Sequence, residues 1–151
     1  MGDSVKRIAG MFCVALLAVL TGCASVPMGS DAEDLAAKGF MPRQGKANIY
    51  VYRHETMGAA VKMPVSLNGR IAGLTASKTY FLFEVDPGSH RLASHTENVA
   101  ELTVNASAGR NYYVWQEVKM GLMQARSNLQ LMDETAGRAG VMECKRAQAS
   151  F

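Results

Sequence analysis

Side chains suited to metal or acid–base chemistry are few in this chain and scattered along it. The histidines are His54, His90 and His95, and the last two are five residues apart on a predicted strand, so they should point to opposite faces. Neither a Cys-x-x-Cys nor a His-Glu-x-x-His spacing, as found in metal sites, occurs in the sequence. We therefore expect no metal site and no cofactor.

Covalent and glycosidic catalysis have equally little support. Cys144 has no histidine near it in sequence, and no Gly-x-Ser-x-Gly elbow is present. A glycosidase needs two carboxylates facing each other across a cleft, and the acidic residues show no such pairing. We expect no catalytic residues and no enzyme activity. Because distant residues can meet in a fold, an envelope enzyme acting on peptidoglycan or glycan stays open as an alternative.

The one clear chemical signal lies near the start of the chain. Lys6 and Arg7 precede an uncharged apolar stretch of 13 residues, 8–20, which suits a signal peptide and is too short to cross a bilayer. Leu20-Thr-Gly-Cys23 follows and resembles the lipobox of bacterial lipoproteins. The resemblance implies cleavage between Gly22 and Cys23, a thioether from the Cys23 sulfur to diacylglycerol, and acylation of the freed amine, for example with palmitate.

Acylation of Cys23 would anchor the protein without a spanning segment, since two or three acyl chains hold a protein firmly at a bilayer. Ala24 and Ser25 follow the cysteine, so an Asp that resembles the inner-membrane retention signal is missing. We expect the periplasmic face of the outer membrane, with membrane lipid as the first partner. The alternative is an ordinary signal peptide that happens to be followed by a cysteine.

Composition narrows the remaining classes. Lys6, Arg7 and Asp3 would leave with the signal peptide, and the mature chain would carry a net charge of about +2, spread along its length. That distribution argues against nucleic-acid binding. Cys144 would have no partner within the mature chain, so a disulfide framework is excluded. We expect the Cys144 thiol to be buried and inert, the alternative being a bond to another chain.

Short alternating runs separated by turn residues predict a mainly β fold, a small antiparallel β-sandwich with a short C-terminal helix. We divide the chain into a signal peptide (1–22), a lipidated, flexible tether (23–46), the sandwich (47–146) and a tail (147–151). Asn68-Gly69 predicts a two-residue type I′ hairpin. The expected strands cover 48–53, 64–73 as a hairpin, 80–85, 91–95, 101–105, 111–118 and 127–132.

The C-terminal helix should begin after Asp133, which can act as its N-cap, and run to about Arg146. Gly137, Val141 and Cys144 would share the face that packs on the sheet. Gly137 and Gly140 should each weaken this helix by up to about 1 kcal/mol relative to alanine.

The globular part also resembles a family of small bacterial lipoproteins known only as a domain of unknown function. Its hairpin and Pro-Gly-x-His-x-Leu run look like the PEGA type of β-sandwich and, more distantly, like carboxypeptidase regulatory-like domains. The resemblance implies a sandwich in the cell envelope and no particular activity. The segments that carry it are Val65–Gly69, Thr79-Tyr80, Val85–Leu92 and Ala108–Val114.

One strand offers a candidate binding face. Alternation along 111–118 places Tyr113 and Trp115 on the same side, where they would form an exposed platform able to stack a sugar or a protein partner. The alternative is that both rings pack under the C-terminal helix or the tether. The run 120–125 contains Met120, Leu122 and Met123 and predicts either an exposed contact loop or an ordinary loop closing the core.

Together these patterns predict a lipid-anchored envelope module that binds or makes structural contacts without catalysis. An envelope protein or peptidoglycan would be its partner. A third reading is an accessory subunit of an envelope assembly or secretion complex.

Overall fold

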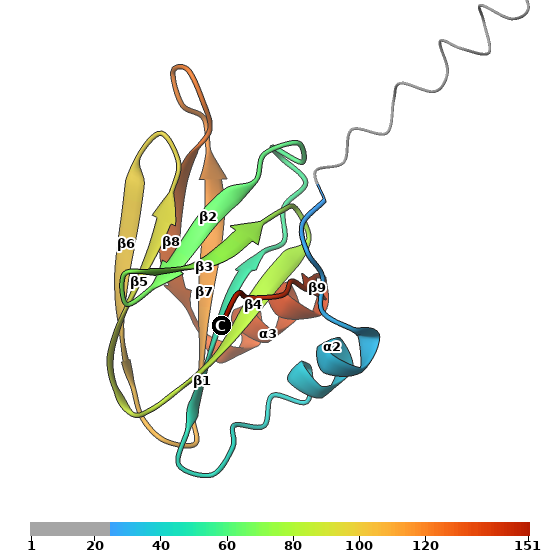
Figure 1. Ribbon diagram of the computed structural model, residues 1–151, viewed down its shortest axis with the longest axis vertical. Coiled ribbons are helices and arrows are strands. Elements are labelled where there is room, and N and C mark those ends of the chain that lie inside the picture. Colours follow the sequence, from blue (N-terminus) through green and yellow to red (C-terminus); the bar gives the residue numbers. More distant parts are fainter. Residues whose placement is uncertain (1–24) are drawn as a thin grey trace, which may run out of the picture.

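The computed structural model describes residues 25–151 and confirms the mainly β sandwich. Two sheets pack face to face, one with the strand order β8-β7-β1-β4-β9 and the other with the order β3-β2-β5-β6 (Figure 1). The predicted signal peptide, the cleavage site at Gly22 and the acylated Cys23 lie outside the described residues. The strands are β1 (Ala47–Arg53), β2 (Met63–Leu67), β3 (Arg70–Thr75), β4 (Thr79–Val85), β5 (Gly88–His95), β6 (Val99–Ala106), β7 (Asn111–Lys119), β8 (Arg126–Met132) and β9 (Lys145–Arg146).

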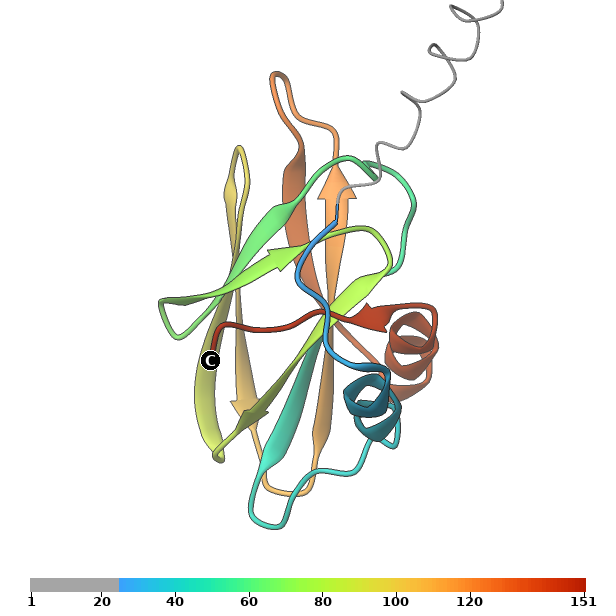
Figure 2. The same ribbon diagram turned by 45° about the vertical axis from the view of Figure 1, so that its right-hand side comes forward.

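The five-stranded sheet is buried on both faces. In β1, Ile49 and Val51 point into the core between the sheets, whereas Tyr50 and Tyr52 point to the opposite face. That face is covered by two helices, α2 (Asp31–Ala37) and α3 (Glu134–Met142), which lie together on one side of the molecule (Figure 2). The fold therefore has three layers: the smaller sheet, the larger sheet, and the helix pair.

The predicted hairpin is present between β2 and β3. Asn68 has φ 52° and Gly69 has φ 83°, and a type I′ turn requires positive φ at both central positions. Asparagine and glycine tolerate this region better than other residues, so the turn follows directly from the two residue types.

The sandwich is not wholly antiparallel. β1 pairs with β4 in antiparallel fashion, but it pairs with β7 in parallel fashion, with Val51 opposite Val114. β9 also runs parallel to β4. The parallel pairing arises because the chain leaves β4, forms the β5–β6 hairpin in the other sheet, and returns as β7 beside the far edge of β1.

Residues 25–46 belong to the folded domain, so the predicted flexible tether does not extend to residue 46. Ser30 and Glu33 form a capping box at the start of α2. Ala37 at the end of this helix and Phe40 after it are buried against the tyrosines of the large sheet. The run of apolar residues in this segment is too short to predict from the sequence that it packs on the sheet. The residues that it contacts lie on strands far away in the sequence.

Asp34 is the polar anchor of this segment. Its carboxylate accepts hydrogen bonds from Lys38 Nζ at 3.0 Å, Tyr80 OH at 2.9 Å and the Arg146 backbone N–H at 3.0 Å. Burial alone would raise the pKa of Asp34, but these three donors outweigh burial and hold the pKa below its ordinary value. Asp34 thus joins α2 to β4 and β9.

The predicted C-terminal helix is confirmed in its cap and its buried face, but it ends at Met142 and not at about Arg146, because Lys145 and Arg146 pair with β4 as strand β9. The Asp133 carboxylate accepts a hydrogen bond from the Ala136 backbone N–H at 2.9 Å. Gly137, Val141 and Cys144 face the sheet. Burial raises the pKa of the Cys144 thiol to about 12, and its Sγ lies 3.5 Å from the Arg53 carbonyl oxygen. The thiol is therefore buried and held in its neutral form, as predicted.

A buried amide connects the two sheets. Gln116 in β7 is fully buried in the core between the sheets, and its Oε1 accepts a hydrogen bond from Thr75 Oγ1 at 2.5 Å. Its Nε2 donates to Ser94 Oγ at 2.7 Å. One side chain of the larger sheet is thereby hydrogen-bonded to two strands of the smaller one, which fixes their relative position.

Candidate functional site

The most distinctive exposed feature is a set of apolar side chains on the loops at one end of the sandwich. Residues 54–62 connect β1 to β2, and residues 120–125 connect β7 to β8; both lie at the upper end of the molecule in Figure 1. Leu122 is 95 % exposed, Met123 is 91 % exposed and Met120 is 85 % exposed. We call these three residues, together with the exposed Met57 of the first loop, the apolar loop surface.

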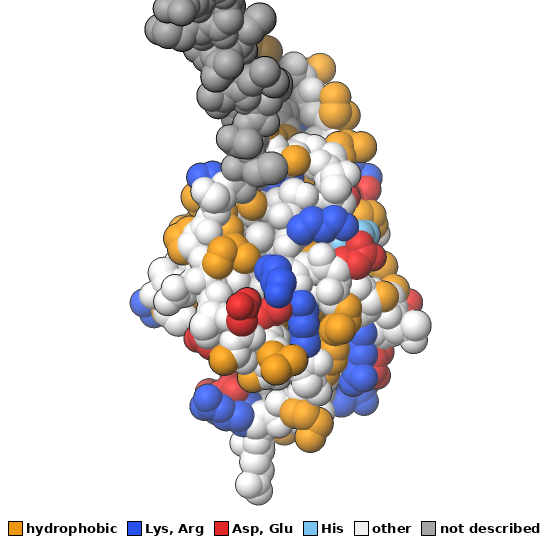
Figure 3. All heavy atoms as spheres, turned by 90° about the vertical axis from the view of Figure 1, so that its right-hand side faces the viewer, with side chains coloured by type: hydrophobic (Ala, Val, Ile, Leu, Met, Phe, Trp, Pro, Cys, Tyr) orange, Lys and Arg blue, Asp and Glu red, His pale blue; other side chains and the backbone are white. Residues whose placement is uncertain are grey.

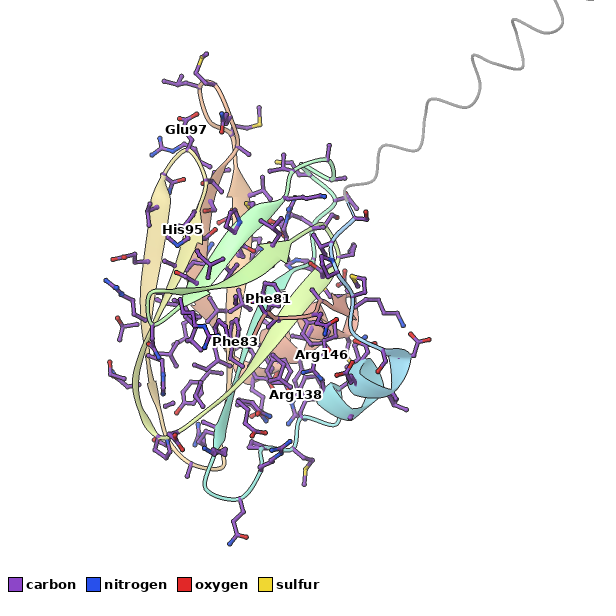
Figure 4. All side chains as sticks on the ribbon, viewed as in Figure 1. Phe81, Phe83, His95, Glu97, Arg138 and Arg146 are labelled. Atoms are coloured by element: carbon purple, nitrogen blue, oxygen red, sulfur yellow. The ribbon has the colours of Figure 1, made fainter. Side chains whose placement is uncertain are left out.

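The β7–β8 loop is held from below by a carboxylate. Glu97, in the turn between β5 and β6, accepts hydrogen bonds from the Gln124 N–H at 2.9 Å and the Met123 N–H at 3.1 Å. These amides hold the pKa of Glu97 below its ordinary value. Figure 4 shows Glu97 at this end of the molecule, beside the loop. Two backbone N–H groups of the loop are thus satisfied by one carboxylate, while the side chains of Leu122 and Met123 remain exposed.

The base of the same loop is fixed by two hydrogen bonds between Asn98 and Ser127. Asn98 Nδ2 donates to the Ser127 carbonyl oxygen at 2.9 Å, and the Ser127 N–H donates to Asn98 Oδ1 at 2.9 Å. The β5–β6 turn therefore holds the β7–β8 loop at both its tip and its base. A loop with these constraints presents its side chains in a defined arrangement, at low entropic cost to a binding partner.

The other loop is organised by a buried arginine. Arg53, at the end of β1, is fully buried and donates to the carbonyl oxygens of Val61 at 2.6 Å and Gly58 at 2.5 Å. Burial lowers the pKa of the Arg53 guanidinium, and the nearby Glu55 carboxylate opposes that shift. One guanidinium thus fixes the path of the β1–β2 connection.

Cationic side chains flank the apolar loop surface. Lys62 and Arg126 are exposed beside the two loops, and neither forms an ion pair with any residue between 25 and 151. Lys119 is paired with Glu117 at 2.6 Å. A shallow groove of about 290 Å³ lies between the loops, with Met57 and Met120 in its lining. Figure 3 shows hydrophobic side chains gathered at this upper end, with Lys and Arg below them.

The predicted aromatic platform is not formed, because Tyr113 is buried. Its ring is 1 % exposed and stacks on Tyr50 with centroids 5.4 Å apart, beneath Gly137 of α3. Trp115 is half-buried, and its Nε1 donates to Glu55 Oε2 at 2.8 Å. The alternative that the aromatics pack under the C-terminal helix is correct for Tyr113. The predicted alternation of β7 side chains is also correct, but the helix covers the face that would have been the platform.

A second groove, at the opposite end of the sandwich, has a volume of about 770 Å³ and is lined by Phe40, Met41, Tyr113 and Arg138, among others. The charge of Arg138 is already engaged there: Nη2 contacts Glu134 Oε1 at 2.7 Å, and the guanidinium lies 4.9 Å from the centre of the Phe40 ring. Figure 4 places Arg138 beside the helices, where it supports their packing. Arg110 also lines this groove; it is exposed and forms no ion pair with any residue between 25 and 151.

Side chains able to bind a metal lie apart from one another in the part of the chain from Ser25 onward. Within these residues, no three or more His, Cys, Asp or Glu side chains come close enough together to hold a metal ion. His90 and His95 are held separately, by Asn68 at 3.0 Å and by Ser66 at 2.9 Å respectively. Neither α2 nor α3 is long and apolar enough to cross a membrane.

Sequence reasoning missed the residues that organise the loop end. Arg53 and Glu97 act through partners that lie up to 27 positions away, and no local motif marks them. The exposed loop itself was found, because an apolar run between two strands that holds Gly121 is recognisable. The sequence did not decide between an exposed contact loop and a loop that closes the core. The structure shows that the loop is exposed and does not close the core.

A family model described as "Protein of unknown function (DUF2846)" matches residues 43–128. The match covers more than half of the chain and spans the strands from β1 into β8 together with both loops of the apolar loop surface. This chain belongs to the DUF2846 family. A relative from Haemophilus influenzae, described as "Uncharacterized protein", is 30 % identical over 97 % of this chain and 89 % of its own length. The helices α2 and α3 lie outside the segment that the DUF2846 model matches.

Proposed function

We propose that this DUF2846 protein is a lipoprotein of the cell envelope that acts by binding or structural contact and carries out no catalysis. In this proposal Cys23 is acylated after cleavage behind Gly22, and lipid holds the domain at the periplasmic face of the outer membrane. The lipobox-like Leu20–Cys23 supports the anchor. The histidines and carboxylates of residues 25–151 are scattered, with no three of them close enough together to hold a metal ion, and this supports a role without catalysis.

The burial of Val26 carries the structural part of the argument. Val26 packs into the core between the sheets, only three residues after Cys23. Two residues of extended chain span at most about 7 Å, so the described domain, which starts at Ser25, would sit directly against an anchored Cys23. A protein held this closely cannot reach far into the periplasm, which suits a role at the membrane surface.

The test is metabolic labelling of the full-length protein with an alkyne-bearing palmitate analogue in a bacterial host. We expect label in the wild type and in Cys144→Ser, whose buried thiol is not a lipidation site, and none in Cys23→Ser. Separation of inner and outer membranes then tests the location. Label that persists in Cys23→Ser, or its absence from the wild type, contradicts the anchor.

The binding role needs a second experiment, because an anchor alone does not name a partner. In-cell crosslinking of the full-length protein, followed by mass spectrometry, separates the readings. A stoichiometric protein partner supports an accessory subunit of an envelope complex, and co-purified peptidoglycan fragments support a glycan binder. Turnover of purified peptidoglycan by the protein would contradict the proposal and favour an envelope enzyme.

A further inference from the structure

We infer that the apolar loop surface is a bilayer-contacting site: Met120, Leu122 and Met123, with Met57 beside them, enter the interface of the membrane that holds Cys23. This inference rests on the proposed lipid anchor and adds the orientation of the domain and the residues that contact lipid. The occupant is the phospholipid bilayer itself.

The first argument is the position of the chain start. The described chain begins at the same end of the molecule as the β1–β2 connection and the β7–β8 loop, as two views agree (blue in Figures 1 and 2). From there it runs along the sandwich to α2 and does not turn back. Cys23 is two residues before Ser25, and that length of chain spans at most about 7 Å. A lipid-bearing Cys23 would therefore bring the bilayer to the loop end.

The second argument is the chemistry of the surface. Methionine and leucine are flexible or compact apolar side chains that suit a fluid hydrocarbon boundary, and three of them project almost fully into solvent here. A monomeric protein rarely exposes neighbouring side chains of this kind without a contact to make. The exposed cations Lys62 and Arg126 lie beside them, where they can meet anionic phospholipid headgroups. Arg126 is also near enough to the Glu97 carboxylate to contribute to its lowered pKa.

The third argument is the internal support of the loop. Glu97 accepts hydrogen bonds from the backbone N–H groups of Met123 and Gln124, so these two groups need no water when the tip enters an apolar environment. That matters because an unsatisfied N–H is costly in a medium that cannot hydrogen-bond.

The experiment places an environment-sensitive fluorophore on single cysteines of the full-length, lipidated protein. Leu122→Cys reports the loop tip. The control is Ala108→Cys, which is also exposed but lies in the β6–β7 turn at the opposite end of the sandwich. Cys144 is buried and should take no label in the folded protein, as the unsubstituted chain checks. Each sample is reconstituted into vesicles of phosphatidylethanolamine and phosphatidylglycerol, with or without doxyl-labelled lipid.

We expect the label at position 122 to shift to the blue in vesicles and to lose intensity with doxyl lipid, while the label at 108 does neither. A label at 122 that behaves like the one at 108 overturns the inference. A blue shift at 122 without quenching means that protein, such as a second copy of this chain, covers the loop, and also overturns it. Mass spectrometry of the same sample separates the two proposals: an unmodified Cys23 refutes the anchor, whereas an acylated Cys23 with an unquenched label refutes the loop contact alone.

Discussion

Replacing Gly137 by alanine tests how closely α3 lies on the large sheet. A Cβ added at Gly137 would lie 2.2 Å from Tyr113 Cγ and 2.3 Å from Tyr113 Cβ. Carbon atoms in contact are about 3.5–4.0 Å apart, so the helix or the ring must move by more than about 1 Å. The ring cannot easily move, because Tyr113 is buried in a central strand and stacked on Tyr50.

Two effects of opposite sign compete in this substitution. Alanine in a helix interior is favoured over glycine by up to about 1 kcal/mol. Overpacking a well-packed core costs about 1–3 kcal/mol. The clash with both Cγ and Cβ of Tyr113 places this substitution at the upper end of that range. We therefore expect Gly137→Ala to lower the free energy of unfolding by about 2 kcal/mol, although helix propensity alone would raise it.

The assay is urea-induced unfolding followed by the fluorescence of Trp115, the only tryptophan. Gly140→Ala should behave like Gly137→Ala, since its Cβ would lie 2.1 Å from Tyr52 Cε2. Ala139→Gly is the matched control on the exposed face of α3 and should lose up to about 1 kcal/mol through propensity alone. If Gly137→Ala proves more stable than the wild type, the helix does not lie this close to Tyr113 and the reasoning is refuted.

Three further predictions concern buried polar groups. Asp34→Asn should lower the free energy of unfolding by about 2 kcal/mol at neutral pH. Because the pKa of Asp34 is lower in the folded state, the stabilisation by its carboxylate is present above the ordinary pKa of 3.8 and is lost as pH falls through the folded-state value. The unfolding curves of the variant and the wild type should therefore converge in acid. Gln116→Ala should cost about 2–3 kcal/mol in urea, against a change within about 0.5 kcal/mol for the exposed control Asn128→Ala. Cys144 should resist a thiol reagent until urea unfolds the chain, as peptide mass spectrometry can follow; rapid native labelling would contradict its burial and its pKa of about 12.

The local patterns of this sequence determined most of the secondary structure. Period-two alternation placed the strands, and Asn68-Gly69 specified a type I′ turn that the backbone angles confirm. Asp133 marked the start of α3, and the i, i+4, i+7 spacing gave its buried face. Such features depend on residues that are close together in the sequence, so they can be predicted from one sequence without an alignment. The lipobox-like run before Cys23 has the same local character and remains a sequence prediction.

Only the tertiary structure decided which side chains are buried and which are exposed. Alternation showed that Tyr113 and Trp115 share a face, but only the docking of α3, made possible by Gly137 and Gly140, buries Tyr113. The same glycines read as weak points of the helix when their spacing is considered alone.

Long-range partners escaped the sequence for a related reason. Glu97 meets Met123 and Gln124, and Asp34 meets Tyr80, across 26 to 46 positions. A carboxylate in a turn looks the same in sequence whether it is solvated or holds another loop in place. Its role depends on which backbone groups the fold brings within hydrogen-bond distance, and that is a property of the whole chain.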